Sequence, residues 1–362
     1  MPTVTGQLSA NNDALDFIEE YLVERGMHIY RTAHDGFGAL VATTKPTKTP
    51  RVMLVGHIDV VTASDAMFTL REENGKIYGR GTYDMKAAIA GYMMAVDHLS
   101  ADLDNYDFGI MITTDEESRD MGVKRLLAEG YCPREAAVLL DGGYDWQVQK
   151  SAKGAWYVTL AIHDKTGHGS RPWLVNSSSL RMIKLLGEIE ALFSDAGPDT
   201  NTLNINMLNA GKPGEAYNQI PAITIAGLDM RFVPHADRER IEHDVHALCE
   251  KYGATLETLV TFDAIEHDME EPHMACFIDN IERYTGLASG GVMSYAASDA
   301  NWFVERGLAC IVTYPLGGGH HSEEEHIDAK SLADLTPILL GYLKEMARAK
   351  NDALVELEPV AH

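Results

Sequence analysis

Val55-Gly56-His57-Ile58-Asp59-Val60-Val61 closes an apolar run that begins at Val52, and the residues before the glycine predict a strand buried on both faces. Residues two apart in a strand point the same way, so His57 and Asp59 are expected on one side of the chain. A carboxylate in that position can hold one imidazole nitrogen and leave the other free to bind a metal. Alone, such a pair is more often a hydrogen-bonded core histidine beside a turn aspartate, so its meaning depends on the other strand ends.

Length and composition restrict the class of protein. At 362 residues the chain is longer than one hydrophobic core usually serves, and we expect two domains. Its 30 basic and 54 acidic residues give a net charge of −24, which argues against nucleic acid or an anionic membrane as a partner. The four cysteines include no Cys-x-x-Cys pair and are expected to be reduced thiols. No signal peptide and no apolar run of about 20 residues is visible, so we expect a cytoplasmic protein.

Three predicted strands each end in polar residues. Besides the opening run, Phe108–Thr113 leads into Thr114-Asp115-Glu116-Glu117, and Ala136–Leu140 leads into Asp141-Gly142-Gly143. Predicted helices over Met85–Leu99 and Gly122–Glu129 separate these strands. This alternation predicts an α/β domain with a mostly parallel central sheet. Ligands bind at the carboxyl ends of the strands in such sheets, and the polar residues all fall there.

The middle of the chain has a different pattern. It predicts strands and helices in the order β-α-β-β-α-β, a compact ferredoxin-like unit. The elements are strands Trp156–His163, Leu203–Leu208, Ile223–Phe232 and Thr255–Phe262, and helices Ser178–Phe193 and Asp237–Tyr252. The α/β pattern resumes near Glu271 and ends with a helix over Leu332–Ala349. We therefore expect one domain from residues 1–154 and 267–362, interrupted by an inserted domain over 155–266.

Together, the strand ends offer the ligands that two neighbouring divalent metals need. Two such ions about 3.5–4 Å apart share a bridging ligand, and zinc accepts imidazole and carboxylate ligands. The smallest protein set is one bridging carboxylate, with one histidine and one further carboxylate for each ion. We expect Asp84 as the bridge, with His57 and Asp141 on one metal and Glu117 and His321 on the other.

Glu116 remains as a carboxylate that neither metal uses, suited to deprotonating a water and protonating the leaving nitrogen. Each residue also has an ordinary structural explanation. Glu116-Glu117 can open a helix, Asp141-Gly142-Gly143 can form a turn, and Asp84 can cap a helix. Their recurrence at successive strand ends favours the metal site. Both His320 and His321 are candidates for the last ligand, and we choose His321 because it lies four residues before Glu325.

In this order of motifs the chain resembles a known family. These are the co-catalytic zinc exopeptidases and deacylases that include aminoacylase, acetylornithine deacetylase, succinyl-diaminopimelate desuccinylase, tripeptidase T and carboxypeptidase G. Five segments carry the resemblance: Gly56–Val61, Gly79-Arg80-Gly81-Thr82-Tyr83-Asp84-Met85-Lys86, Thr114–Glu117, Leu140–Gly143 and His321–Glu325. The inserted domain matches through Gly167–Pro172 with Asn176, Asn218–Pro221 and Asp229–Arg231. The resemblance implies a zinc-exopeptidase-like catalytic domain with an inserted lid and dimerisation domain.

The resemblance also implies roles for residues around the metals. Asp59 would orient His57, and Glu325 would be an outer partner of His321. Members of the family carry a cis peptide bond after the bridging aspartate, which here would join Asp84 and Met85.

In the inserted domain, the resemblance assigns His168 to the oxyanion in the neighbouring subunit's active site, which requires a homodimer. Arg231 and Asn218 would bind the carboxylate of the substrate, a task that suits the fixed fork of a guanidinium. An ion pair within the inserted domain remains the alternative for Arg231. Trp173 and Tyr217 are further candidates for the substrate pocket.

We expect a hydrolase with two divalent ions, zinc first with cobalt or manganese as alternatives. It would cleave an amide bond in a small peptide or N-acyl amino acid with a free carboxylate. Asp141 is similar to the residue in tripeptidase T and carboxypeptidase G, where several deacylases have glutamate, and this favours a dipeptidase or carboxypeptidase. The alternatives are an N-acyl-amino-acid deacylase, such as a deacetylase or desuccinylase, and a metal-free binding homologue. The latter would be expected to lack a ligand, and none is missing.

Overall fold

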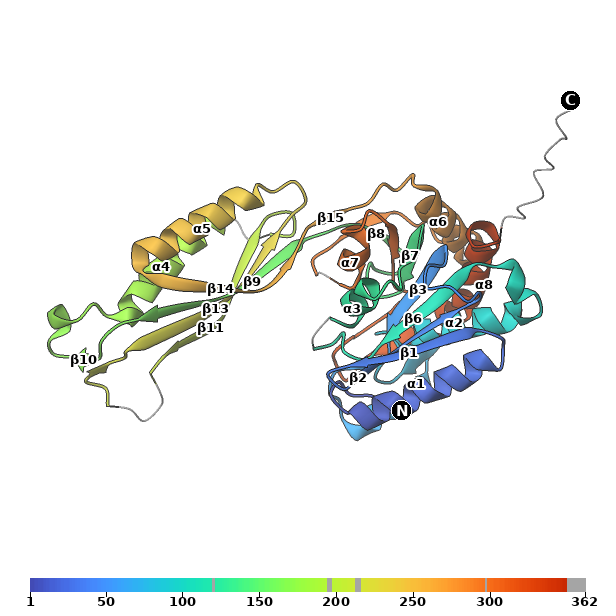
Figure 1. Ribbon diagram of the computed structural model, residues 1–362, viewed down its shortest axis with the longest axis horizontal. Coiled ribbons are helices and arrows are strands. Elements are labelled where there is room, and N and C mark those ends of the chain that lie inside the picture. Colours follow the sequence, from blue (N-terminus) through green and yellow to red (C-terminus); the bar gives the residue numbers. More distant parts are fainter. Residues whose placement is uncertain (119–120, 194–196, 212–215, 297, 350–362) are drawn as a thin grey trace, which may run out of the picture. The chain divides into compact units, whose positions relative to one another are not determined.

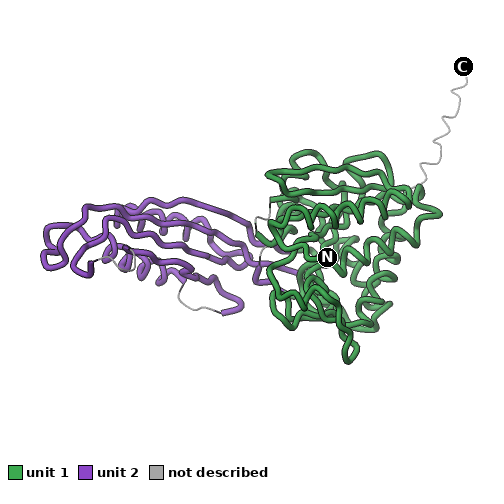
Figure 2. The backbone as a smooth tube through the Cα atoms, turned by 90° about the horizontal axis from the view of Figure 1, so that it is seen from below, with its two compact units in different colours: residues 1–149, 267–292, 298–362 green, residues 150–266, 293–297 purple. Residues whose placement is uncertain are grey.

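The computed structural model describes residues 1–118, 121–193, 197–211, 216–296 and 298–349, which form two compact units (Figure 2). Unit 1 comprises Met1–Gln149, His267–Val292 and the chain from Ser298 onward, and unit 2 comprises Lys150–Glu266 and the segment from Met293. Unit 2 therefore begins a few residues before the predicted insertion and includes a second short segment. Strands β8 (Val148–Ala152), β15 (Ile265–Glu266) and β16 (Gly291–Ser294) form one small sheet, with β8 in its middle.

A six-stranded sheet forms the centre of unit 1 (Figure 1). Its order is β1 (His28–His34), β2 (Phe37–Thr43), β6 (Phe108–Thr113), β3 (Val52–His57), β7 (Ala136–Leu139) and β17 (Ala309–Val312). The last four strands run parallel, whereas β1 and β2 pair antiparallel at one edge. Every residue of β3 and β6 is buried, as expected for strands covered on both faces. The predicted α/β class with a mostly parallel sheet is confirmed.

Helices cover this sheet and complete its core. They are α1 (Leu8–Val23), α2 (Lys86–Leu99), α3 (Gly122–Ala128), α6 (Pro272–Thr285), α7 (Ala300–Val304) and α8 (Ala329–Met346), with short 3₁₀ turns η1 (Asp65–Phe68) and η2 (Ser100–Asn105). Helix α2 packs on β3 and on α8, and α8 also packs on α6. The side chain of Asp328 caps α8 by accepting the Ser331 N–H at 2.9 Å, and Glu271 followed by Pro272 starts α6.

A second, smaller sheet in unit 1 has the order β18 (Gly317–Gly318), β19 (His326–Asp328), β5 (Lys76–Tyr78) and β4 (Arg71–Glu73). Its neighbours pair antiparallel, with His326 opposite Tyr78. This pairing brings two segments that are far apart in sequence side by side. The loop that follows β5 carries Asp84, and the loop that precedes β19 carries His321.

Unit 2 contains a four-stranded antiparallel sheet with the order β11 (Thr202–Ala210), β13 (Ile223–Phe232), β9 (Gly154–His163) and β14 (Ala254–Phe262). Helices α4 (Ser178–Glu190) and α5 (Arg238–Tyr252) lie along one face of it (Figure 1). The order along the chain is β-α-β-β-α-β. Short elements complete the unit: β10 (Gly167–His168) pairs with β12 (Gln219–Ile220), and η3 (Pro172–Leu174) and η4 (Ala191–Phe193) are 3₁₀ turns.

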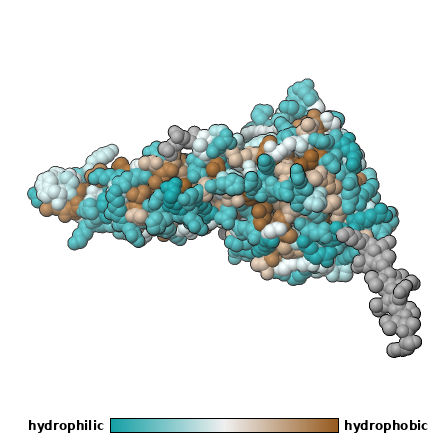
Figure 3. Space-filling view, turned by 90° about the horizontal axis from the view of Figure 1, so that it is seen from above, coloured by the Kyte–Doolittle hydropathy of each residue, from teal (hydrophilic) through white to brown (hydrophobic). Residues whose placement is uncertain are grey.

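Among the residues that the structure describes, no helix is long and apolar enough to cross a membrane. On the face drawn in Figure 3, hydrophilic residues predominate and hydrophobic residues gather in small patches.

Candidate metal centre

The predicted site residues of unit 1 meet at the carboxyl edge of the central sheet. His57 is the last residue of β3 and pairs with Thr113, the last residue of β6. Val55 pairs with Leu139 at the end of β7. Parallel strands in this register end level with one another, so His57, the segment after Thr113 and the segment after Leu139 emerge together.

Asp84 lies between two histidines. Its Oδ1 lies 3.2 Å from Nε2 of His57, and its Oδ2 lies 3.2 Å from Nε2 of His321. The side chain is buried, and the two carboxylate oxygens face different imidazoles. This is the arrangement that a bridging ligand requires.

The structure forms two groups of donor atoms that share Asp84. One group is His57, Asp84 and Asp141, and the other is Asp84, Glu117 and His321; within each group the donor atoms lie within 4.8 Å of one another. Nε2 of His321 lies 2.9 Å from Oε2 of Glu117, and Nε2 of His57 lies 3.8 Å from Oδ2 of Asp141. All five predicted ligands are thus brought together.

His320 takes a different position from His321. Its ring centroid lies 5.9 Å from that of Tyr83 and 6.4 Å from that of Tyr314, and it belongs to neither donor group. The preceding glycines make room for the same aromatic cluster, because a Cβ at Gly317 would overlap the Tyr83 ring. The glycine run therefore leaves space for the side chain of Tyr83, which packs against the loop.

The donor set fits divalent metal ions. Nε2 of His57 is buried without a hydrogen bond, although it faces the carboxylates of Asp84, Glu116 and Asp141. Four carboxylates and two imidazoles so close together carry excess negative charge, which cations would neutralise. Mixed imidazole and carboxylate donors are the ligands of zinc and related divalent ions.

The carboxylates and imidazoles shift each other's protonation. Burial, and then the charge of Asp84, raise the pKa of Asp141 to about 7. Burial also acts to raise the pKa of Asp84, but the neighbouring imidazoles of His321 and His57 outweigh it and lower that pKa well below its usual range. Hydrogen bonds to Asp84 and to Glu117 raise the pKa of His321 to about 10.

We therefore expect metal binding to displace protons. At pH 7 the metal-free site holds protons on His321 and His57 and a partial one on Asp141, since the pKa of each is raised. Because ligands must be deprotonated, the apparent metal affinity should rise with pH between 6 and 9, and binding should release about two to three protons per pair of ions. Calorimetric titrations in buffers of different ionisation enthalpy measure this number. Release of no protons would contradict the assignment of these ligands.

Asp59 supports two of the donors. The His57 ring donates from Nδ1 to the backbone carbonyl of Asp59 at 3.0 Å, and the Asp59 carboxylate lies 3.5 Å from the same nitrogen. The other carboxylate oxygen accepts the backbone N–H of Glu117 at 3.2 Å and the hydroxyl of Thr5 at 2.8 Å. Asp59 is thus placed to hold both His57 and Glu117 in position.

Glu325 has different partners from those expected. It was predicted to support His321, but its carboxylate accepts the backbone N–H groups of Tyr83 at 3.0 Å and Asp84 at 3.2 Å, and it pairs with Arg80. The physical reason is the pairing of β19 with β5, which turns Glu325 toward the loop that carries Asp84. The predicted cis peptide bond between Asp84 and Met85 is present.

Loss of the Glu325 charge should destabilise the protein strongly. Both members of the Arg80–Glu325 pair are buried, and removing one leaves the other charge unpaired, at a cost of about 3–5 kcal/mol. We expect Glu325→Gln to lower the free energy of unfolding by this amount in urea titrations. The matched control is Glu73→Gln, which removes the exposed pair with Arg71 and should cost less than about 1 kcal/mol. Equal effects of the two substitutions would contradict the role of Glu325.

Tyr314 was not predicted as a site residue. Its hydroxyl donates to Oδ1 of Asp141 at 2.5 Å, and its ring stacks on Tyr83 with centroids 4.4 Å apart. In the sequence Tyr314 lies at the end of an apolar run, where a buried strand is expected, and no neighbouring residue distinguishes it from a core residue.

We expect Tyr314→Phe to weaken the affinity for one of two metals by about 10–100-fold in competition titrations with a chelating dye. Tyr83→Phe, which keeps the stacked ring, is the control and should bind both metals normally.

Glu116 lies at the edge of the cluster. Its Oε2 is 3.9 Å from Nε2 of His57, its side chain is 19% exposed, and it belongs to neither donor group. A carboxylate that adjoins the donors and still reaches solvent can exchange protons with a bound substrate.

The three site residues predicted in unit 2 lie in two different places. Nε2 of His168 lies 3.3 Å from the amide nitrogen of Asn218, because β10 and β12 pair. Arg231 forms an ion pair with Asp229, with Nε 2.7 Å from Oδ1, and donates to the hydroxyl of Tyr157. The ion pair within the inserted domain, which was the alternative for Arg231, is thus present, and binding of the substrate carboxylate by Arg231 and Asn218 stays a prediction. Trp173 and Tyr217 are exposed.

The chain is similar to known proteins over most of its length. The family model described as peptidase family M20/M25/M40 matches residues 53–345. The succinyl-diaminopimelate desuccinylase of Caulobacter sp. (strain K31) is 27% identical over 93% of this chain and 91% of its own, and that of Xylella fastidiosa (strain 9a5c) is 25% identical over 85% and 87%. A solved tripeptidase from Staphylococcus aureus has a TM-score of 0.75 at 20% identity, covering 94% of both chains. An M20 family metallo-carboxypeptidase from Sulfolobus solfataricus has 0.76 at 16% identity, covering 95% and 96%. The family match extends over most of the sequence, and the chain is therefore a member of peptidase family M20/M25/M40, a family of metal-dependent hydrolases.

Proposed function

We propose that this enzyme uses two divalent metal ions, with zinc as the preferred metal, to hydrolyse an amide bond of a small substrate. The observation that carries the proposal is the position of Asp84, whose two oxygens face the imidazoles of His57 and His321. Asp84 would bridge the ions, with Asp141 completing one donor set and Glu117 the other. When bound, such a pair polarises the scissile carbonyl and lowers the pKa of a water.

The residues around the donors supply the remaining chemistry. Glu116 accepts the proton of the attacking water and passes it to the leaving nitrogen, since it is a carboxylate outside both donor groups. Asp59 keeps the Nδ1 proton of His57 in place, so that Nε2 faces the centre. His168, from a partner chain, would donate to the developing oxyanion.

The substrate that we propose is a small peptide with a free carboxylate, cleaved by an exopeptidase. Asp141 supports this choice, because peptidase members of the family resemble the chain at this position. A second candidate is an N-acyl-amino-acid deacylase, favoured by the relatives named succinyl-diaminopimelate desuccinylase.

A substrate panel tests the proposal. Dipeptides, tripeptides, and N-acetyl, N-succinyl and N-formyl amino acids would be assayed with zinc, cobalt or manganese, each beside its carboxyl-amidated form. We expect the fastest turnover for free dipeptides or tripeptides, and loss of turnover on amidation. Preference for N-succinyl amino acids would select the deacylase, and no hydrolysis by enzyme with two bound metals would refute both.

We further propose a homodimer formed through unit 2. Strand β11 lies at an edge of the sheet, with no partner on its outer side among the described strands, and most of its side chains are exposed. On α4, which packs on neighbouring β13, Leu180 and Ile183 are each 58% exposed, one helical turn apart. This edge can pair with a second copy.

Mixing two inactive variants tests whether His168 acts across the dimer. A Glu116→Gln chain keeps its own His168, and a His168→Ala chain keeps its own Glu116. A mixed dimer holds one site with both groups only if His168 serves the partner, so mixing should restore activity. Failure to restore it, in dimers whose subunit exchange is shown by native mass spectrometry with one mass-tagged chain, would contradict the proposal.

A further inference from the structure

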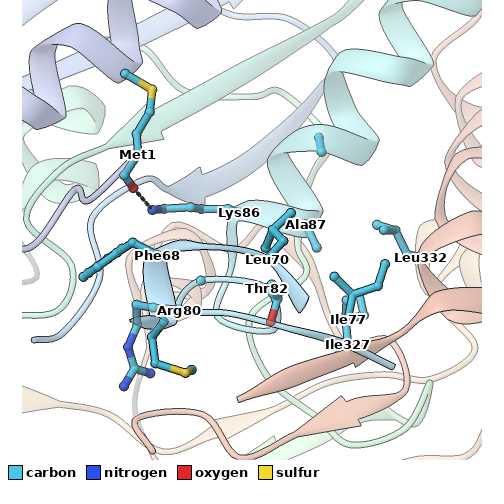
Figure 4. A pocket seen from close by; sticks show the side chains of 13 residues that line it. Met1, Phe68, Leu70, Ile77, Arg80, Thr82, Lys86, Ala87, Ile327 and Leu332 are labelled. Carbon is cyan, nitrogen blue, oxygen red and sulfur yellow. Dashed lines mark hydrogen bonds between the residues drawn. The ribbon is translucent and has the colours of Figure 1, made fainter. Parts of the chain in front are cut away.

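Unit 1 contains a cavity of about 320 Å³ next to the loop that carries Asp84 (Figure 4). Its walls come from η1 and the residues after it, from α2, and from the start of α8. The lining is mainly apolar and includes Phe68, Leu70, Ile327 and Leu332. Leu70 is 67% exposed, so an apolar rim faces solvent. None of the five proposed metal ligands lines this cavity.

Lys86 brings a positive charge into the same lining. Its ammonium donates one hydrogen bond, to the backbone carbonyl of Met1 at 2.9 Å, and forms no ion pair with any residue that the structure describes. An ammonium has three donors, so two remain available. Arg80 also lies in the lining, but Glu325 already engages it.

We propose that this cavity binds a small amphiphilic monocarboxylate, with its apolar chain between Phe68, Ile327 and Leu332 and its carboxylate on Lys86. Apolar walls select a hydrocarbon chain by area buried. A partly buried ammonium with no ion-pair partner among the described residues favours an anionic head group, because charges out of water need a partner. The two features together select an amphiphile of this charge.

The ligand would contact the loop of the metal centre from its other side. Arg80, Gly81 and Thr82 form part of the cavity and precede Asp84 by two to four residues. The backbone N–H of Lys86 donates to the carbonyl of Gly81 at 2.8 Å, and a Cβ at Gly81 would lie 2.8 Å from Cδ of Lys86. Lys86 therefore packs tightly on this loop.

Calorimetric titration with octanoate tests the site directly. The full chain would be titrated with octanoate, hexanoate and butanoate, both with metals and after chelation. We expect saturable binding that survives chelation and tightens about four-fold for each added methylene until the cavity is filled. Octan-1-ol and octylamine, which lack the carboxylate, should bind more weakly. Absence of saturable binding, or affinity independent of chain length, would overturn the proposal.

Two variants locate the ligand. Ala90 lies on α2 in the lining, and Ala90→Phe should abolish binding by filling the cavity, whereas Ala333→Phe, outside it, should not. Lys86→Met keeps the apolar stem and should weaken binding about ten- to hundred-fold, because a charged hydrogen bond is lost. Lys184→Met in unit 2 is its control. With folding verified by thermal unfolding, unchanged affinity in Ala90→Phe or in Lys86→Met would refute the assignment.

Discussion

A Glu116→Gln variant should bind two metal ions and lose about two to four orders of magnitude in kcat, the contribution of a general base. Glutamine keeps the shape of the side chain but cannot accept the proton of the attacking water. Metal binding should survive because Glu116 belongs to neither donor group, and its nearest approach to His57 Nε2 is 3.9 Å. Steady-state kinetics on the best substrate of the panel, together with metal content by elemental analysis, measure both quantities on the same sample.

Two further glutamates make this experiment specific. Glu72→Gln changes an exposed residue of β4 and should leave both activity and metal content unchanged. Glu117→Gln should lose activity together with one metal, because Glu117 belongs to the donor group of His321. If Glu116→Gln also loses a metal, Glu116 is a ligand; if it stays fully active with two metals, another group is the base.

The part of the fold that the sequence predicts well is the central sheet. Strand β6 spans Phe108–Thr113 as predicted, and β7 ends within one residue of the prediction. Fully buried parallel strands are short apolar runs, so their limits are visible in composition alone. Polar residues after such runs must lie at one edge of the sheet, and for this reason the sequence alone groups the donors.

The small sheet of unit 1 could not be predicted in the same way. Its strands are two or three residues long, too short for an alternating pattern, and β5 pairs with β19 about 250 residues away. The partners of Glu325 depend on this pairing. Without it, the sequence predicts Glu325 as a partner of His321. Contacts such as those of Glu325 depend on pairing between strands that are far apart in the chain, and the amino-acid composition does not indicate this pairing.

The side-chain partners of Tyr314 and Arg231 could not be predicted from the sequence either. The hydroxyl of Tyr314 reaches Asp141 only because β17 lies beside β7. Arg231 meets Asp229 two residues away on the same strand, a pairing that period-two geometry allows but does not require. In both cases the residue type was compatible with more than one role, and only the fold selects among them.

An Asp84→Asn variant should lose both metals. Each oxygen of Asp84 faces a different histidine at 3.2 Å, so the neutral amide removes an anionic donor from both groups at once. We expect kcat/KM to fall by at least about three orders of magnitude, since several kcal/mol of transition-state stabilisation leaves with the metals. The rise in melting temperature on adding zinc to chelated protein should also disappear, because only bound ligand stabilises the folded state.

The comparison with Asp141→Asn decides whether Asp84 is shared. Asp141 belongs to one group only, so its amide variant should keep one metal, bound by His321, Glu117 and Asp84. In metal-free protein the same variant should be more stable than wild type above pH 7. The pKa of Asp141 is raised to about 7 in the fold, and its ionisation there opposes folding as pH rises from about 4. If Asp84→Asn retains one metal as tightly as Asp141→Asn does, the two donor groups do not share Asp84, since a shared carboxylate must weaken both sites.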